Sequence, residues 1–325
     1  MKWFASELHT HTLHSDGNFT VKELCETAKS YGLSCIAMTD HNTMSGLAEV
    51  DIDLQEKTVS VIRGIEWTTY YGHMCVLGAE KYVDWRDATP YNIDEKITDI
   101  KKYKGVVGVA HPFVIGSPMC TGCHWSFEVH KWENVDYIEI WSEQFPAIRT
   151  LNHRSRKMWM NLLDNGYRIA ATYGKDWHGK QVENVPSAVT YLGVNDDIIT
   201  GENALVALRE GRTYVTMGPT IDTYIKQSNK VYSIGDQLSN GKSEIIVEVG
   251  IDLRKDMWER FNLIPETVSI ISNNSKVIDE KEINNINDEL VFDVNLSDGW
   301  LIVQVNGKAM NKECVLAFTS PFYIA

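Results

Sequence analysis

Histidine and acidic residues are concentrated near the N-terminus, in the segment Glu7–Gly17, which reads ELHTHTLHSDG. His9 and His11 are two residues apart, so on an extended backbone their side chains point to the same side. Asp176 and His178 repeat this spacing far along the chain. Imidazole and carboxylate groups, without thiolates, are typical ligands of zinc, manganese or iron. These two segments are therefore candidate parts of a metal site.

More residues of these types stand at or beside the ends of short apolar runs. In a parallel barrel such strand ends meet on one rim, where active sites lie. A lone histidine is more often a hydrogen-bonded core or surface residue than a ligand. Buried together without a cation, however, these groups would suffer desolvation and like-charge repulsion. The joint pattern therefore predicts bound divalent metal. Asp40 and Glu139 are expected only to support the ligands. The remaining candidate ligands are Asp16, His41, Glu66, His73 and His111.

The number of candidate ligands exceeds what one tetrahedral ion needs, so two or three divalent ions (Mn, Zn or Fe) are expected. Clustered ions bring the pKa of a bound water near neutrality and hold attacking and leaving oxygens, which is hydrolytic chemistry.

The elements that must position these residues follow a repeating pattern from Glu7 to about Tyr191. Short apolar runs without alternation predict parallel strands covered on both faces, and helical stretches between many of them predict an α/β fold. About seven such strands fit a closed or distorted barrel better than an open sheet. The segment Ser187–Leu192 is expected to add an edge strand. The predicted strands are Glu7–His9, Ser34–Thr39, Val59–Ile65, His73–Ala79, Gly105–Ala110, Val135–Ile140 and Tyr167–Thr172, and the predicted helices are Thr20–Tyr31, Asn92–Lys104 and Leu151–Asn165.

After a helical segment at Glu202–Gly211, the alternation of strand and helix patterns gives way to short strand-like runs. The segment Thr213–Thr220 resembles a domain boundary. We expect a barrel over residues 1–215 and a small all-β sandwich over residues 216–325. Its predicted strands, separated by turn-rich spacers, are Ile221–Ile225, Glu244–Val249, Thr267–Ser272, Leu290–Val294, Trp300–Val305 and Cys314–Thr319.

Composition excludes some classes of protein. The 325 residues carry a formal net charge of −13, which argues against broad nucleic-acid binding through phosphate contacts. No run of about 18 apolar residues is present, so no membrane span is expected. The N-terminus has no secretory h-region, which favours a cytoplasmic protein with reduced cysteines. We expect a small-molecule substrate, and the oligomeric state is left open.

The motifs HTHTLHSDG, TDHN, GIEWT, GHMCVLG, AHPF and DWH resemble, in order, those of the PHP (polymerase and histidinol phosphatase) superfamily. The resemblance covers about the first 180 residues and implies a distorted (β/α)7 barrel, similar to a TIM barrel, with a di- or trinuclear metal centre. It implies one ion on His9, His11, Glu66 and Asp176. A second ion would share Glu66 and bind His73 and His111, and a third would bind Asp16, His41 and His178. The segment ALREGRTYVTMGPT at residues 207–220 resembles the CehA/McbA-like branch.

The resemblance implies a metal-dependent hydrolase, with a phosphoesterase acting on a small phosphorylated substrate as the first reading. Metal-bound hydroxide held beside Glu66 would attack the substrate, and Asp176 or His178 would assist proton transfer. A carbamate, ester or amide hydrolase at the same centre is one alternative, and a binding module with structural metal is another. Lys175 would either hold a substrate phosphate or point outward. Cys120 and Cys123 are interpreted as a reduced pair in a loop that could line the substrate pocket.

Overall fold

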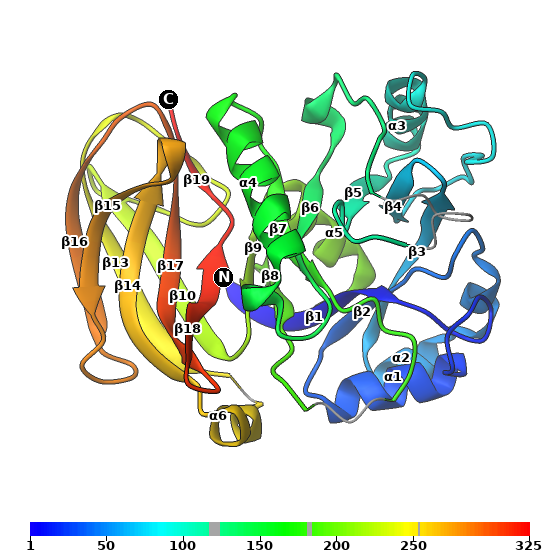
Figure 1. Ribbon diagram of the computed structural model, residues 1–325, viewed down its shortest axis with the longest axis horizontal. Coiled ribbons are helices and arrows are strands. Elements are labelled where there is room, and N and C mark those ends of the chain that lie inside the picture. Colours follow the sequence, from blue (N-terminus) through cyan, green and yellow to red (C-terminus); the bar gives the residue numbers. More distant parts are fainter. Residues whose placement is uncertain (117–123, 181–183, 253) are drawn as a thin grey trace.

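The computed structural model describes residues 1–116, 124–180, 184–252 and 254–325. All seven apolar runs of the N-terminal part form strands, which lie side by side in chain order in a curled sheet (Figure 1). Most of their residues are buried, as expected for strands covered on both faces. They are β1 (Lys2–Thr10), β2 (Cys35–Met38), β3 (Ser60–Thr69), β4 (Gly72–Leu77), β5 (Val106–Ala110), β6 (Tyr137–Ser142) and β7 (Ala170–Gly174).

Strand β4 departs from the expected parallel arrangement. It is antiparallel to both β3 and β5, whereas β1–β2–β3 and β5–β6–β7 pair in parallel. Only a tight turn separates β3 from β4, and a parallel crossover requires a dozen or more residues. Between β7 and β1 the described residues form one isolated bridge, from Thr10 to Trp177. The region is therefore a curled α/β sheet with one reversed strand.

The predicted helices are present, with ends shifted by one or two residues. Thr20 caps α1 and accepts a hydrogen bond from the backbone of Glu23, whose carboxylate accepts one from the backbone of Thr20, which confirms the capping box. The short helices α2 and α6 were not predicted. The helices are α1 (Val21–Ser30), α2 (Ile52–Lys57), α3 (Ile93–Lys102), α4 (Thr150–Asp164), α5 (Gly201–Arg209) and α6 (Lys255–Phe261), with 3-10 turns η1 (Ser45–Glu49), η2 (Trp132–Asn134), η3 (Pro146–Ile148) and η4 (Asn273–Ser275).

The expected edge strand is an interior strand. Strand β8 (Val189–Val194) pairs antiparallel with β1 on one side and with β9 (Thr213–Thr216) on the other. Strand β9 also pairs with β18 (Lys312–Thr319) of the C-terminal region. The segment Ser187–Leu192 alone gives no sign of this second partner. Because β9 pairs with β8 and with β18, the sheet continues from the N-terminal region into the C-terminal one. The boundary between residues 215 and 216 falls inside β9 and stays a prediction.

The C-terminal region is all-β apart from α6, and its six predicted runs are all strands (Figure 1). One sheet contains β10 (Pro219–Gln227), β11 (Lys230–Tyr232), β13 (Gly241–Ile251) and β16 (Glu289–Leu296). The burial of β10 alternates along the strand, and its Ile225 lies in the same apolar core as Ile270 and Val303 of the other sheet. The other strands are β12 (Gln237–Leu238), β14 (Ile264–Ser272), β15 (Lys276–Glu282), β17 (Gly299–Ala309) and β19 (Phe322–Ile324).

No helix within the described ranges is both long enough and apolar enough to cross a bilayer.

Candidate metal centre

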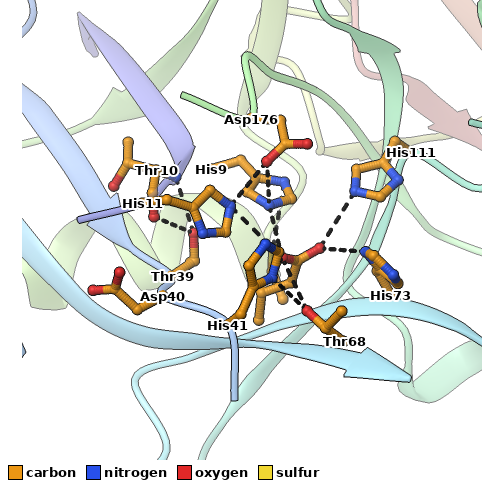
Figure 2. A network of polar contacts seen from close by, with 12 residues as sticks. His9, Thr10, His11, Thr39, Asp40, His41, Thr68, His73, His111 and Asp176 are labelled. Carbon is orange, nitrogen blue, oxygen red and sulfur yellow. Dashed lines mark hydrogen bonds and ion pairs between the residues drawn. The ribbon is translucent and has the colours of Figure 1, made fainter. Parts of the chain in front are cut away.

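The candidate ligands converge at the carboxyl ends of the parallel strands. His9 is in β1 and His11 directly follows it, while the later candidates follow β2, β5 and β7 or lie in β3. His73 begins β4, and because β4 is reversed its first residues lie beside the ends of β3 and β5, with His73 opposite Thr68 and Ala110. Figure 2 shows six of these side chains gathered around one point, those of His9, His11, His41, His73, His111 and Asp176. The structure thus brings together all nine residues: His9, His11, Asp16, His41, Glu66, His73, His111, Asp176 and His178.

Glu66 is the centre of this cluster. Its carboxylate is fully buried. Five imidazole nitrogens approach it: His73 Nδ1 at 2.9 Å and His111 Nε2 at 3.3 Å on Oε1, and His41 Nδ1 at 2.6 Å, His9 Nε2 at 3.3 Å and His11 Nε2 at 3.6 Å on Oε2. Burial opposes ionisation of this group, but the surrounding histidines outweigh it and hold the pKa of Glu66 well below its usual range. Glu66 is therefore an anion at the centre of the histidine cluster.

Asp176 occupies the opposite side of the two N-terminal histidines. Its Oδ1 lies 2.9 Å from His11 Nε2 and 3.3 Å from His9 Nε2. Burial again opposes ionisation, but the charge on His9 and the contact with His11 keep the pKa of Asp176 far below its usual range. Asp176 and His111 both adopt positive φ, 54° and 26°. Such strained backbone is concentrated at functional sites, where the surrounding structure enforces it.

A third carboxylate, Asp16, lies beside His41 and His178. Asp16 Oδ1 lies 3.3 Å from His41 Nε2 and 3.0 Å from His178 Nε2. The rings of His41 and His178 each lie 4.1 Å from that of His11. The side chain of Asp16 is 60% exposed and that of His178 is 28% exposed, whereas His9, His11 and Glu66 are inaccessible. Asp16 and His178 thus mark the open side of the cluster.

The buried polar atoms of this cluster fit a metal centre. His9 Nε2, both ring nitrogens of His11, His111 Nε2 and Asp176 Oδ1 are buried and make no hydrogen bond. A buried polar atom without a partner costs about 1–3 kcal/mol, and several in one place are rare in folded proteins. Divalent cations would supply a partner to Asp176 Oδ1 and to one ring nitrogen of each histidine, since imidazole and carboxylate donors suit zinc, manganese and iron.

Four groups of the nine residues have donor atoms within 4.8 Å of one another. His9 belongs to two groups, one with His11 and Glu66 and one with His111 and Asp176. Glu66, His73 and His111 form a third group, as expected for a second ion. The fourth contains His11 as well as the expected Asp16, His41 and His178. The division of the nine ligands among ions therefore stays a prediction.

Glu139 positions two of the candidate ligands. Its Oε1 lies 2.9 Å from His9 Nδ1, and its Oε2 accepts a hydrogen bond of 2.9 Å from the backbone N–H of His111. A proton on Nδ1 leaves the Nε2 lone pair of His9 directed at the cluster, which is how carboxylates orient metal-binding histidines. Gly174 makes room for this carboxylate, since a Cβ there would lie 2.4 Å from Glu139 Oε1.

Replacing Glu139 by glutamine is expected to weaken metal binding by about 10- to 100-fold, because an amide cannot accept both of these hydrogen bonds. Gly174→Ala should act in the same direction by displacing the carboxylate without removing it. Metal affinity is measured by competition with a chromophoric chelator. Unchanged affinity in both folded variants would contradict the positioning role of Glu139.

Sequence reasoning missed two buried groups beside His9. Glu7 Oε1 accepts hydrogen bonds of 2.9 Å from the backbone N–H groups of His9 and Lys175, tying β1 to the segment that carries Asp176. Burial raises the pKa of Glu7 to about 8. Cys75 Sγ lies 3.9 Å from His9 Nδ1, and burial raises the pKa of this thiol to about 12, so it stays protonated. The sequence did contain a signal for both groups. Glu7 is two residues from His9 and Cys75 is two residues from His73, and residues two apart on a strand point to the same face.

Asp40 and Thr68 hold neighbouring parts of the site. Asp40 accepts hydrogen bonds from the backbone and hydroxyl of Thr12 and from Ser15, which fixes the loop between β1 and Asp16. This agrees with its expected supporting role. Thr68, which was not singled out, contacts His41 Nδ1 and donates to Glu66 Oε2 at 3.3 Å.

The other candidates lie apart from the cluster or within the core. The ammonium of Lys175 lies over the rings of Tyr31 and Trp177, at 5.1 Å and 4.6 Å from their centroids. Trp67 and Trp141, two aromatic residues near strand ends, are core residues with 1% and 3% exposure. Cys120 and Cys123 lie outside the described residues.

Comparison with known proteins places these features in a family. The family model described as the PHP domain matches residues 7–140. An uncharacterised protein of Methanocaldococcus jannaschii is 31% identical over 126 residues, which cover 35% of this chain and 70% of that protein. A 5′-3′ exoribonuclease of Haemophilus influenzae is 35% identical over 63 residues, 19% of this chain and 23% of the relative, so the match spans about a quarter of that enzyme.

One solved structure resembles the whole chain. It is a two-domain protein of Bacteroides vulgatus that contains a predicted PHP-like metal-dependent phosphoesterase. The match covers 99% of this chain and 95% of that one, with a TM-score of 0.53 and 12% sequence identity. At this identity the likeness concerns the fold, and it includes the all-β region as well as the curled sheet.

Proposed function

Because this chain belongs to the PHP domain family, we propose that it is a metal-dependent phosphoesterase that acts on a small phosphorylated substrate. The observation that carries the proposal is the buried Glu66 carboxylate, surrounded by five histidines of which three have buried nitrogens without hydrogen-bond partners. A closed structural site is usually complete with four ligands. This larger cluster with an open side is better suited to hold ions that also contact a substrate.

Two or three divalent ions would be held by the nine residues. When bound, such ions polarise a phosphoryl oxygen, activate water and neutralise the charge that develops on the leaving oxygen. Glu66 would stay ionised between neighbouring cations, and Glu139 would keep the Nε2 lone pair of His9 directed at the cluster. The fully buried His9, His11 and Glu66 exclude water from the inner side of the centre.

Asp176 and His178 are the residues best placed to exchange a proton with the substrate. Their side chains are 30% and 28% exposed, in contrast to the inaccessible inner ligands. His178 Nδ1 lies 2.8 Å from the backbone carbonyl of Asp176, which orients the ring with Nε2 toward Asp16 and the open side. We infer that they assist proton transfer to the leaving oxygen.

Local charge favours an anionic substrate in spite of the net charge of −13. The candidate ligands include three carboxylates, on Asp16, Glu66 and Asp176. Two divalent ions would exceed them by one positive charge and three ions by three. Bound metal would thus counter the negative charge of these carboxylates at the open side of the cluster, where a phosphate group would bind.

The alternative chemistry is hydrolysis of a carbamate, ester or amide at the same centre. It is favoured by the resemblance of residues 207–220 to the CehA/McbA-like branch, which stays a prediction. The match to an exoribonuclease favours including phosphodiesters among the substrates tested.

Assays of the protein loaded in turn with Mn, Zn and Fe separate these activities. Aryl phosphates, phosphodiesters and bisphosphorylated nucleotides would be compared with aryl esters and carbamates at equal concentration. We expect kcat/KM for one phosphate class to exceed that for the carbonyl substrates by at least about 100-fold, the discrimination that a site built around charged contacts achieves. Preference for carbamates or esters would support the alternative, and no turnover on the panel would favour a binding module.

A further inference from the structure

A cavity of about 570 Å³ lies on the side of α4 that faces the all-β region. Helix α4 packs against β6 on one side and against η4 and β17 on the other, between the two regions (Figure 1). The cavity shares no residue with the candidate metal centre. Its polar lining includes His153, Arg156, Lys157, Asn161, Ser275 and Gln304.

Arg156 carries an uncompensated charge in this cavity. Its Nη2 donates to Gln304 Oε1 and its guanidinium lies over the ring of Phe318, 5.0 Å from the centroid. The Nε is buried without a hydrogen-bond partner. Within the described residues, no carboxylate forms an ion pair with Arg156. Burial lowers the pKa of the Arg156 guanidinium to about 10. A buried guanidinium normally has an anionic partner, since an unpaired buried charge is strongly destabilising.

The acidic residue at this cavity, Asp164, is already engaged. Its Oδ1 accepts hydrogen bonds of 2.9 Å from the backbone N–H of Asn274 and from Trp300 Nε1, which joins the end of α4 to η4 and β17. Lys157, next to Arg156 on the helix, forms no ion pair within the described part of the chain. The positive charges of Arg156 and Lys157 therefore exceed the charge of the one carboxylate that lines the cavity.

We propose that this cavity is a second binding site, which takes a phosphate group, either as the free ion or carried by a small organic molecule. The guanidinium of Arg156 and the ammonium of Lys157 would bind the phosphate oxygens, with amide and hydroxyl groups of Asn161 and Ser275 as further donors. The volume lies in the range of small-molecule sites and exceeds what phosphate alone requires. A bound molecule would contact both α4 and the all-β region.

Isothermal titration of the metal-loaded protein tests the proposal. Methylphosphonate is the probe, because it has no ester bond to hydrolyse, and inorganic phosphate is titrated in a parallel arm. We expect two classes of sites, one at the metal centre and one at this cavity. Arg156→Gln should weaken the second class by at least about tenfold and leave the first unchanged, as expected for loss of a charge-assisted contact. Tighter binding of methylphosphonate than of phosphate would identify an organic phosphate as the ligand type.

Arg260→Gln is the matched control, because Arg260 also stacks on a phenylalanine ring, at 5.2 Å from Phe261, but does not line the cavity. It should retain both classes of sites. If Arg156→Gln does not fold, Lys157→Gln replaces it, since Lys157 is exposed on the helix surface. A single class of sites in the unmodified protein, or two classes that persist in the folded variants, would overturn the proposal.

Discussion

Replacing either His9 or Asp176 by alanine is expected to lower turnover by at least about 100- to 1,000-fold and to reduce the metal content of the purified protein. The ions supply several kcal/mol of charge stabilisation, and each 1.36 kcal/mol corresponds to a tenfold change in rate. His9 Nε2 lies 3.3 Å from both Glu66 Oε2 and Asp176 Oδ1, so its loss removes the ring nitrogen that lies beside both carboxylates. Loss of Asp176 removes the negative charge beside His9 and His11.

Two measurements are needed, because a fall in activity alone would also follow from misfolding. Metal content is determined by elemental analysis, and folding is followed by circular dichroism. His130→Ala is the control, since His130 is an exposed histidine whose described hydrogen bonds, to Asp94, involve only its backbone. Full activity and full metal content in either His9→Ala or Asp176→Ala would refute the assignment of these residues as ligands.

The convergence of the candidate ligands could be predicted from the sequence because it follows from strand order. Apart from Asp16, which lies in the loop after β1, each residue stands in or near an apolar run, and parallel strands in chain order bring their ends together. His73 was the exception in position, since it begins its strand instead of ending it. The reversal of β4 explains the exception. The sequence feature that required it was the short gap between the runs Val59–Ile65 and His73–Ala79, which leaves no room for a parallel crossover.

The supporting contacts could be predicted only in part. Asp40 was recognised because it adjoins His41 in the sequence, and Glu139 because it stands near the end of an apolar run. The partner of Glu139 had no such signal, since Glu139 contacts His9 across 130 positions of the chain. Such a pairing depends on the curl of the sheet and the absence of a side chain at Gly174, neither of which has a local signal. The same applies to β8, whose second neighbour β9 lies across the predicted boundary between the two regions.

The interior beneath the metal centre depends on a second glycine, and Gly108→Ala is expected to destabilise the fold by about 1–3 kcal/mol or more, the usual cost of overpacking a core. Gly108 of β5 faces Tyr137 of β6, and a Cβ there would lie 1.9 Å from Tyr137 Cζ. Tyr137 is fully buried, so its ring has no open space into which to move. The change in free energy of unfolding is measured by urea denaturation.

A double-mutant cycle separates this clash from any intrinsic effect of alanine on β5. In Tyr137→Leu the atoms that a new Cβ would meet are gone, because all three close contacts are with the far part of the ring. Gly108→Ala should therefore cost much less in that background than in the unmodified protein, a coupling expected of residues in contact. An equal cost in both backgrounds would mean that the strand tolerates no side chain at this position for another reason. The smaller cost would show that the Tyr137 ring packs directly on the backbone of Gly108. This contact would then set the spacing of β5 and β6, the strands that position His111 and Glu139 at the centre.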